Sequence, residues 1–229
     1  MNIYSFYDYQ FILFGDLDMA AKSNTRKERE RLARKQEVLE VALALFSEKG
    51  FHEVSMQEVA DRAEFSVGTL YNLFGKKDGL FDELIEHAGK LILEDVLPIL
   101  DMPGTEETRL RAFLQHQPQV MEDHARFITL YVTVMGQKGS KFAQNHTKDE
   151  IHEVIVARIT SLVESGINQG CFRTVHPMIT AKAVISMLET MAIEVAGQFD
   201  RDKVVAMFVE IEKLFVDGLL LRGDQANEV

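Results

Sequence analysis

The sequence predicts an all-α protein. Apolar residues recur at the three- and four-residue spacing of one helix face, first at Val38, Leu39, Ala42, Leu45 and Phe46. No segment alternates apolar and polar residues between turn signals, which is the pattern of a half-buried strand. The chain of 229 residues suits one large domain or two smaller ones, and no apolar run in it reaches the roughly 18 residues that span a bilayer.

The N-terminal third of the chain carries start and stop signals for helices. Gly50 follows the first apolar pattern at the place of a C-cap, and Ser55 with Glu58 forms a capping box before the next helix. Ser66 is placed to cap a third helix. We expect these helices over residues 26–49, 56–63 and 67–73, followed by a fourth that begins near residue 77 and runs toward Pro98.

The remainder of the chain predicts longer amphipathic helices. They are expected over residues 105–123, 125–138, 147–169, 177–197 and 202–221, with breaks at Pro103-Gly104, Gly136 to Ser140, Gly170 and Gly197. Pro118 falls inside one of these helices. A proline there kinks or divides the helix, because it lacks an N–H and clashes with the preceding turn.

The net charge of −11 argues at first against a nucleic-acid partner, but the charge is unevenly distributed. Between Lys22 and Lys35 there are seven basic residues against the acidic Glu28 and Glu30. A basic arm on an acidic body is typical of phosphate contact. A solvated helix start is the other interpretation that this stretch allows.

Residues 1–18 differ from the rest of the chain because they are rich in aromatic residues and contain no Lys or Arg. They lack the basic start, long apolar run and cleavage site of a secretory signal. We expect residues 1–21 to be a disordered or loosely attached tail, or an over-extended start before Met19. The single cysteine, Cys171, excludes an intrachain disulfide and is compatible with a reducing compartment, and we expect a cytoplasmic protein.

Residues 55–74 are the most informative segment, because they predict two short helices joined by a tight turn. Such helices pack nearly at right angles. The second can lie in the major groove of DNA, which is about 12 Å wide and admits one helix. This spacing therefore indicates a helix-turn-helix motif.

Around this motif the sequence resembles the TetR family of transcriptional regulators. The stretch VLEVALALFSEKGFHEVSMQEVADRAEFSVGTLYNLFGKKDGLFDEL, residues 38–84, is similar to the DNA-binding domain of that family. The matching positions are Ala42, Phe46, Gly50, Phe51, Ser55, Val59, Ala60, Ser66, Val67, Gly68, Thr69, Leu70, Tyr71, Phe74, Lys77, Leu80 and Phe81. In the remainder, SGINQGCFRTVHP at 165–177 resembles the turn before the family's last two helices.

Two positions depart from the family pattern. Glu64 stands where a glycine is usual in the turn, and a left-handed backbone there costs a non-glycine residue roughly 1 kcal/mol. Leu73 replaces the usual His or Tyr, which puts a phosphate contact at that position in doubt. Neither departure breaks the pattern of buried residues.

The resemblance implies a division into two domains. Residues 22–92 would form a three-helix helix-turn-helix domain, joined by the fourth helix to a larger C-terminal ligand-binding and dimerisation domain at 93–229. It implies a transcriptional regulator, in the simplest case a repressor, that binds palindromic double-stranded operator DNA as a homodimer. A small, largely apolar molecule would release it from that DNA.

The resemblance also implies which residues contact DNA. Gly68 would let the backbone approach the groove floor, and Thr69 offers a hydroxyl and a methyl group to base edges. Tyr71 and Lys77 match residues that reach phosphates, and Lys77 would act at the start of a helix. The expected set is Ser55, Gln57, Ser66, Val67, Gly68, Thr69, Tyr71, Asn72 and Lys77.

In the C-terminal domain, apolar walls with a few polar groups are typical of small-molecule pockets. The candidate ligand-binding residues are Phe113, His116, Gln117, Phe127, Tyr131 and Met135. The last two helices have broad apolar faces, and such helices pair across a two-fold axis in the family. The candidate dimer-interface residues are Met187, Met191, Glu194, Phe208, Glu212 and Phe215.

Other chemistry is less well supported. A metal site is conceivable from the set His146, Asp149, Glu150, His152 and Glu153, but a solvated helix start explains these residues better, and we expect no metal. No glycine-rich phosphate loop is present, and we expect neither a cofactor nor an enzyme. Two alternatives remain: a DNA-binding regulator controlled by a protein partner, and an all-helical enzyme or carrier.

Overall fold

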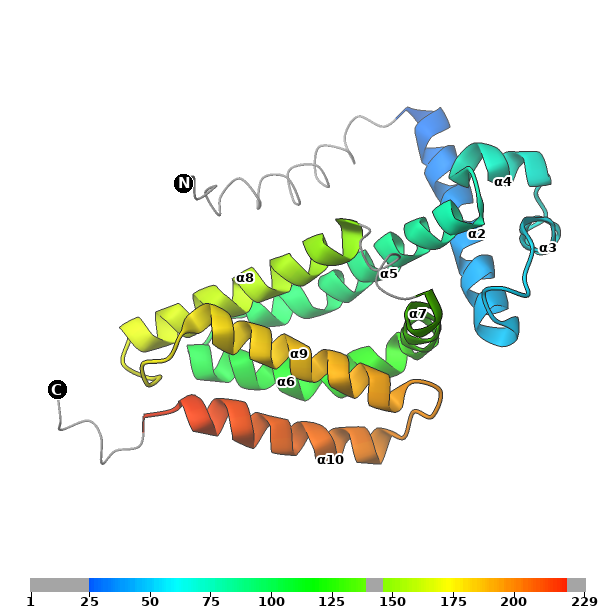
Figure 1. The fold of residues 1–229 in the computed structure, drawn as a ribbon. Coiled ribbons are helices and arrows are strands. Elements are labelled where there is room, and N and C mark those ends of the chain that lie inside the picture. The colour runs from blue at the N-terminus through cyan, green and yellow to red at the C-terminus, as the bar shows by residue number, and fades with distance from the viewer. Residues whose placement is uncertain (1–24, 139–145, 222–229) are drawn as a thin grey trace.

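The computed structural model describes residues 25–138 and 146–221, with backbone alone for 135–138 and 146–151. Within these ranges the chain forms nine α-helices and no extended sheet, which confirms the all-α class (Figure 1). They are α2 (Arg26–Lys49), α3 (Met56–Arg62), α4 (Val67–Phe74), α5 (Lys77–Leu100), α6 (Glu106–Asp123), α7 (Ala125–Lys138), α8 (His146–Asn168), α9 (Pro177–Val195) and α10 (Arg201–Glu212). The expected N-terminal tail lies outside the described residues.

Helices α2, α3 and α4 pack with the first half of α5 around one apolar core. Its largest fully buried side chains are Phe46, Phe81, Leu70, Leu80 and Leu84. Burying these side chains together is the main favourable term that holds the short helices α3 and α4 against α2 and α5. The unit stands at one end of the molecule in Figure 1, and α5 leads from it into the larger domain.

The predicted helix starts in the N-terminal domain are confirmed. The Ser55 side chain accepts a hydrogen bond from the Glu58 amide at 3.1 Å, and the Ser66 side chain accepts one from the Thr69 amide at 3.1 Å. Each side chain caps an amide of the first helical turn, where the regular i−4 acceptors are missing. In the turn between α3 and α4, Glu64 has a φ of 58°, so the non-glycine residue does occupy the left-handed conformation.

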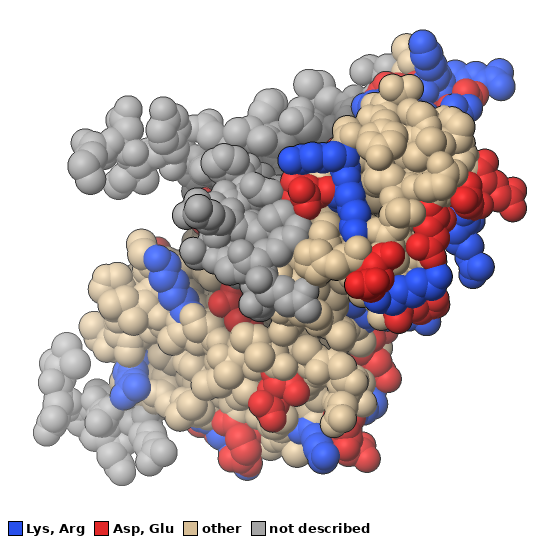
Figure 2. All heavy atoms as spheres, turned by 45° about the vertical axis from the view of Figure 1, so that its right-hand side comes forward, with Lys and Arg blue, Asp and Glu red and all other residues tan. Residues whose placement is uncertain are grey.

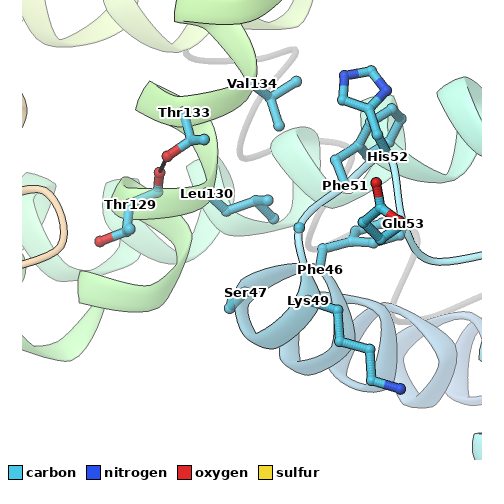
Figure 3. Close-up of a pocket in the computed structure, with 11 residues that line it drawn as sticks. Phe46, Ser47, Lys49, Phe51, His52, Glu53, Thr129, Leu130, Thr133 and Val134 are labelled. Carbon is cyan, nitrogen blue, oxygen red and sulfur yellow. Dashed lines mark hydrogen bonds between the residues drawn. The ribbon is translucent and has the colours of Figure 1, made fainter.

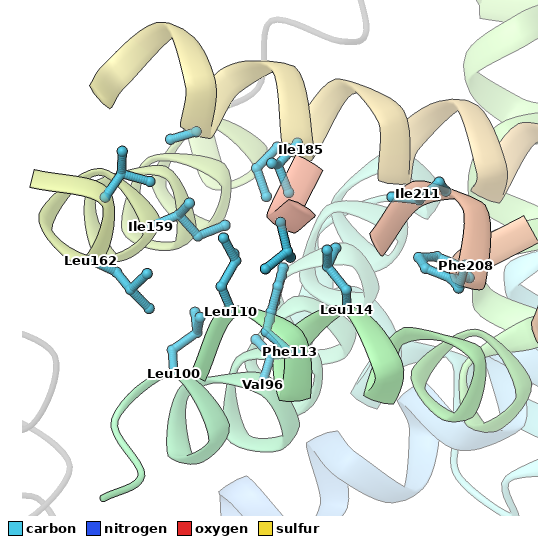
Figure 4. Packing of buried hydrophobic residues seen from close by; sticks show 14 of the residues in the cluster. Val96, Leu100, Leu110, Phe113, Leu114, Ile159, Leu162, Ile185, Phe208 and Ile211 are labelled. Atoms are coloured by element: carbon cyan, nitrogen blue, oxygen red, sulfur yellow. The ribbon is translucent and has the colours of Figure 1, made fainter. Parts of the chain in front are cut away.

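The C-terminal domain packs five helices and the second half of α5 around a larger core. Helix α6 lies at its centre, with Leu110, Phe113 and Leu114 directed between the surrounding helices (Figure 4). Helix α8 contributes Ile159 and α10 contributes Phe208. This core forms because every one of these helices has an apolar stripe wide enough to be buried.

A close packing contact explains the glycine pattern before α9. A Cβ at Gly166 would lie 2.1 Å from the ring of Phe172, which folds back onto α8. The Phe172 amide donates to the Gly166 carbonyl at 3.0 Å, and Gly170 has a φ of 74°. A glycine is therefore required at 166 for contact and favoured at 170 for conformation.

Some helix limits differ from those predicted. Helix α5 continues through Pro98 to Leu100, and α6 runs without interruption through Pro118, so neither proline ends its helix. The final helix, expected over 202–221, changes at Lys213–Asp217 into a π-helical turn. In the part of the chain described, no helix combines the length and apolar character needed to cross a membrane.

Candidate DNA-binding and effector sites

Helix α4 presents an exposed outer face from a firmly anchored position. Leu70 and Phe74 are buried in the N-terminal core and fix the helix, while Gly68, Tyr71 and Asn72 are exposed. Tyr71 is 51% exposed, which is unusual for a large aromatic side chain that serves only packing. The predicted contacts at 68, 71 and 72 are thus brought together on one accessible surface.

The first turn of α4 is organised by its cap. The hydroxyl groups of Ser66 and Thr69 are 2.8 Å apart, and Val67 and Thr69 are half-buried. On α3, Ser55 is occupied as the N-cap, and the Gln57 amide donates to Asp61 at 2.7 Å. These hydroxyl and amide groups are held in fixed positions, as expected for groups that present polar atoms to a partner.

Lys77 has a specific environment at the start of α5. Its Nζ donates to the His52 carbonyl at 3.2 Å and lies 4.5 Å from the centre of the Phe51 ring. The ammonium group therefore ties the loop between α2 and α3 to α5, a role that the sequence did not reveal. The neighbouring Lys76 is exposed, with its Nζ 3.9 Å from Asp78.

The basic arm becomes the first turns of α2. Lys27, Arg29 and Arg34 are exposed, and Figure 2 shows Lys and Arg side chains projecting from the upper edge of the N-terminal domain. Within the helix, ion pairs join Arg26 to Glu30 at 2.8 Å and Arg31 to Glu28 at 3.2 Å. Lys35, at 2.6 Å from Glu83, anchors this part of α2 to α5.

The C-terminal domain contains an apolar cavity of about 230 Å³ that opens to solvent. Its wall is formed by α5, α6, α7, α8 and α9, through Ile85, Gly89, Ile92, Val96, Phe113, Gln117, Val120, Met121, Phe127, Ile128, Tyr131, His152, Ile155, Ile185, Leu188, Glu189 and Ala192. Four predicted residues line it: Phe113, Gln117, Phe127 and Tyr131. His116 is half-buried and is not part of the wall, and the Met135 side chain lies outside the described residues.

The polar groups of the cavity are few. Gln117 is 5% exposed, and its amide nitrogen donates to the Phe113 carbonyl one turn earlier at 3.0 Å. His152 on α8 lies with its Nδ1 3.6 Å from an oxygen of Glu189 on α9. Neither Glu189 nor the α5 residues were predicted, because their spacing on the helices is the same as that of ordinary core or surface residues.

Helix α7 belongs to both domains. Phe127, Ile128 and Tyr131 line the cavity, whereas Leu130 and Val134 are buried in the N-terminal core. Residues on adjacent faces of one helix thus contact the apolar cavity and the core of the N-terminal domain. A rigid helix in this position can transmit a displacement from one to the other.

Beside the α7 contact there is an open cleft of about 300 Å³ between the domains. Figure 3 shows Thr129, Leu130, Thr133 and Val134 of α7 on one side, with the end of α2 and the following loop on the other. The Thr133 hydroxyl donates to the Thr129 carbonyl at 2.8 Å. The cleft leaves space for the N-terminal domain to change its angle against α7.

The predicted dimer residues divide into two groups. Glu194 is exposed, and Met187, Met191 and Phe215 are half-buried against the domain core. Phe208 is only 3% exposed, and Glu212 pairs with Arg111 at 2.7 Å, so both are committed to contacts within their own chain. The exposed apolar side chains of these helices are instead Met178, Ile179, Ile193, Val205, Val209 and Leu214.

The structure, over the residues that it describes, gives no support to the metal site that the sequence made conceivable near the start of α8. No group of three or more His, Cys, Asp or Glu side chains within those residues is arranged to hold a metal ion. The side chains of His146, Asp149 and Glu150 lie outside the described residues.

A helix-turn-helix domain joined to a larger helical domain is the architecture of a DNA-binding transcriptional regulator. The model of bacterial regulatory proteins of the tetR family matches residues 38–84, and that of the tetracyclin repressor-like C-terminal domain matches residues 103–213. The chain belongs to the TetR family of transcriptional regulators.

Individual relatives agree with this assignment. The HTH-type transcriptional regulator YfiR of Bacillus subtilis is 25% identical over 205 residues, covering 85% of this chain and 94% of the relative. The HTH-type transcriptional repressor KstR2 of Mycobacterium tuberculosis is 24% identical over 141 residues, covering 62% and 70%.

Solved structures share the fold. A TetR-family regulator from Pectobacterium atrosepticum has a TM-score of 0.67 at 22% identity and covers 87% of this chain and 99% of its own. The fatty acid degradation regulator FadR of Bacillus halodurans has a TM-score of 0.69 at 14% identity and covers 82% and 97%. At these identities the likeness concerns the fold alone.

Proposed function

We propose that the protein is a ligand-responsive transcriptional repressor that binds a palindromic operator as a homodimer in the cytoplasm. A small, largely apolar molecule in the C-terminal cavity releases it from DNA. The observation that carries this proposal is the position of α7, whose adjacent faces line the cavity and enter the core of the DNA-binding domain.

Helix α4 is the proposed recognition helix. Gly68, Thr69 and Asn72 face the base edges, and Tyr71 reaches the sugar-phosphate backbone. The exposed basic residues of α2, together with Lys76 and Lys77 at the start of α5, add sequence-independent attraction for phosphates. The charge distribution supports DNA binding by a chain with a net charge of −11, since residues 22–77 carry 11 basic and 9 acidic side chains, whereas residues 78–229 carry 14 basic and 24 acidic ones.

The homodimer is proposed to form through α9 and α10. Ile193 on α9 and Leu214 in the π-helical turn after α10 are 62% and 65% exposed. Large apolar side chains that gather on the surface of a single chain are unfavourable in water and mark a contact with a partner. Ile179, Ala183, Ser186, Thr190 and Ile193 follow each other at spacings of four and three residues and form one exposed stripe on α9. A second copy across a two-fold axis would cover it and set the distance between the two recognition helices.

Release follows from differential binding of the effector. A ligand in the cavity contacts Phe127, Ile128 and Tyr131 and shifts α7, and Leu130 and Val134 carry that shift into the DNA-binding domain. The equilibrium moves only as far as the ligand prefers the conformation that does not fit the operator. A tenfold preference corresponds to about 1.4 kcal/mol of coupling.

Names of similar proteins support the repressor role and the apolar ligand class. KstR2 is described as a transcriptional repressor and as a ketosteroid regulator, and FadR as a regulator of fatty acid degradation. These terms refer to those proteins. For this chain, an apolar ligand is proposed because the wall of its own cavity is apolar.

The test combines operator binding with identification of the effector. Purified protein is titrated onto labelled DNA from upstream of its own gene, and native mass spectrometry identifies any small molecule that co-purifies. We expect specific binding by two protomers and release by an apolar compound. Failure to bind upstream DNA would favour an enzyme or carrier, and release only by another protein would favour a partner-controlled regulator.

A further inference from the structure

The described wall of the proposed effector cavity contains an acidic side chain and no permanently charged cation. Among the described residues of its wall, the charged or chargeable side chains are Glu189 on α9 and His152 on α8, and neither Lys nor Arg contributes to the wall. The Glu189 side chain is 43% exposed, so its carboxylate lies where the cavity meets solvent and avoids the cost of full burial. A ligand carboxylate placed there would meet a like charge.

The rest of the wall favours a positive group in a second way. Phe113, Phe127 and Tyr131 line the same cavity, and the rings of Phe127 and Tyr131 are 5.9 Å apart at their centres. Aromatic faces attract cations through their negative electrostatic potential, whereas they offer nothing comparable to an anion. The aliphatic side chains around them bind a hydrocarbon body without regard to its charge.

We propose that the effector of this cavity is a lipophilic cation, a compact hydrocarbon body that carries one amino or quaternary ammonium group. Glu189 supplies the counter-charge and the aromatic rings supply cation–π attraction, with His152 Nδ1 3.6 Å from the Glu189 carboxylate. This inference rests on the proposed function in one respect only: it takes the cavity to be the effector site.

The test uses three rigid probes that share one hydrocarbon cage: 1-aminoadamantane, 1-adamantanol and adamantane-1-carboxylate. Binding to the full-length protein without DNA is measured by titration calorimetry. We expect the amine to bind about tenfold more tightly than the alcohol, as fits one partly exposed ion pair with a cation–π contribution, and the carboxylate to bind more weakly than either.

Two variants connect the preference to the residue. Glu189→Gln keeps the shape of the side chain and removes its charge, and the preference for the amine over the alcohol should fall to within about threefold. Glu164→Gln on α8 removes an exposed carboxylate that does not line the cavity, and the preference should persist. Tighter binding of the carboxylate, an unchanged preference in Glu189→Gln, or no binding of any probe would overturn the inference.

The same probes separate this inference from the proposed function. Their effect on operator DNA is measured independently by fluorescence anisotropy. A Glu189-dependent preference for the amine supports the charge assignment even if DNA affinity does not change, in which case release by ligand is the part that fails. Release by the carboxylate with no response to the amine would support the repressor and contradict the lipophilic cation.

Discussion

Gly68 occupies a position in α4 that folding does not require to be glycine. A Cβ there would come no closer than 3.8 Å to another atom, the Ser66 hydroxyl oxygen, and the residue lies in regular helix. Gly68→Ala should therefore raise the free energy of unfolding by about 0.5–1 kcal/mol, because alanine loses less conformational freedom in a helix. Thermal unfolding would measure this gain.

The same substitution should weaken operator binding, since the methyl group would stand between the helix backbone and the floor of the groove. Anisotropy titrations would detect the loss beside the gain in stability. Opposite signs of the two effects would assign Gly68 to DNA contact. If operator affinity stays equal to that of the unchanged protein, the close approach of α4 at this position is wrong.

Thr69 and Lys77 should respond differently when each is replaced by alanine. Thr69→Ala removes a hydroxyl without changing charge, so we expect a loss of about 1–3 kcal/mol on operator DNA only, with the salt dependence unchanged. Lys77→Ala should weaken binding to operator and random DNA alike. If each subunit loses one phosphate contact, the salt slope falls in magnitude by about 2.

The measurement for this pair is affinity for operator and random DNA at several salt concentrations. Lys77 also ties the His52 carbonyl to α5, so thermal unfolding serves as the control for a loss of stability. A uniform loss with Thr69→Ala, together with an operator-specific loss with Lys77→Ala, would contradict the proposed orientation of α4.

Residue roles near the motif were predictable only where local chemistry decides them. The caps at Ser55 and Ser66 and the left-handed Glu64 follow from short-range sequence patterns, and all three are present. The contact of Lys77 with the Phe51 ring depends on how a distant loop folds back, which no local pattern encodes. Leu73, half-buried against the core, belongs to packing.

At the scale of elements, buried Glu106 joins the start of α6 to the end of α8. Its carboxylate accepts hydrogen bonds from Ser165 at 2.8 Å, Gln169 at 2.9 Å and Arg109 at 2.9 Å. Burial by itself would raise the pKa of Glu106, but the bonds from Ser165 and Gln169 and the charge of Arg109 outweigh burial and hold this pKa below its ordinary value.

A lowered pKa in the folded state means that the charged form of Glu106 stabilises the protein. This stability is fully present above the ordinary carboxyl pKa and is lost as the pH falls through the folded-state value. Glu106→Gln should therefore lower the free energy of unfolding at pH 7 by about 2 kcal/mol, and by less at acidic pH. Urea unfolding at pH 7 and pH 4 checks this, and an equal loss at both values would contradict it.

Helix α7 is the element on which coupling between ligand and DNA depends. Leu130→Ala should leave ligand binding intact while reducing the ratio of DNA affinities measured without and with effector. The Leu130 side chain is 4% exposed and packs in the N-terminal core. Its truncation therefore removes a contact between α7 and that core. Thr133→Ala, exposed on the same helix, is the matched control and should keep the full ratio. An undiminished ratio in Leu130→Ala would remove α7 from the mechanism.

The sequence was enough to predict which segments are helical, but not how the helices continue at their prolines or how the last helix ends. Pro118 remains inside α6 because burial of its ring in the domain core offsets the missing backbone hydrogen bond, whereas Pro98 is exposed in the last turn of α5. The π-helical turn after α10 is stabilised by Arg111, which contacts Glu212 at 2.7 Å and Asp217 at 2.5 Å. Those carboxylates, Asp217 foremost, raise the pKa of Arg111 above its ordinary value.

At the scale of the whole molecule, α5 and α7 join the two apolar cores, because each of these helices has side chains in both. The aromatic part of the cavity could be predicted, because Phe113, Phe127 and Tyr131 lie on the middle helices of a domain that the family resemblance indicated to be ligand-binding. Its α5 wall and Glu189 could not, since only the packing of five helices brings them to the same space. The inward direction of Phe208 was likewise decided by tertiary packing.

Ile193→Asp tests the dimer on which this architecture depends. Ile193 is 62% exposed in the single chain, so an aspartate there should leave the fold of the protomer intact. In a dimer it would bury an unpaired charge against an apolar surface, at a cost of several kcal/mol. We expect a dimer at micromolar concentration for the unchanged protein and a monomer for the variant, measured by sedimentation velocity.

Operator binding gives the second readout of that variant. Two linked recognition helices bind a palindrome far more tightly than one, so Ile193→Asp should lose most of its preference for the full operator over a single half-site. The matched control is Leu91→Asp, which alters an exposed apolar residue on α5, 39% exposed and away from α9 and α10. A dimeric Ile193→Asp protein with full operator affinity would move the interface to another face of the molecule.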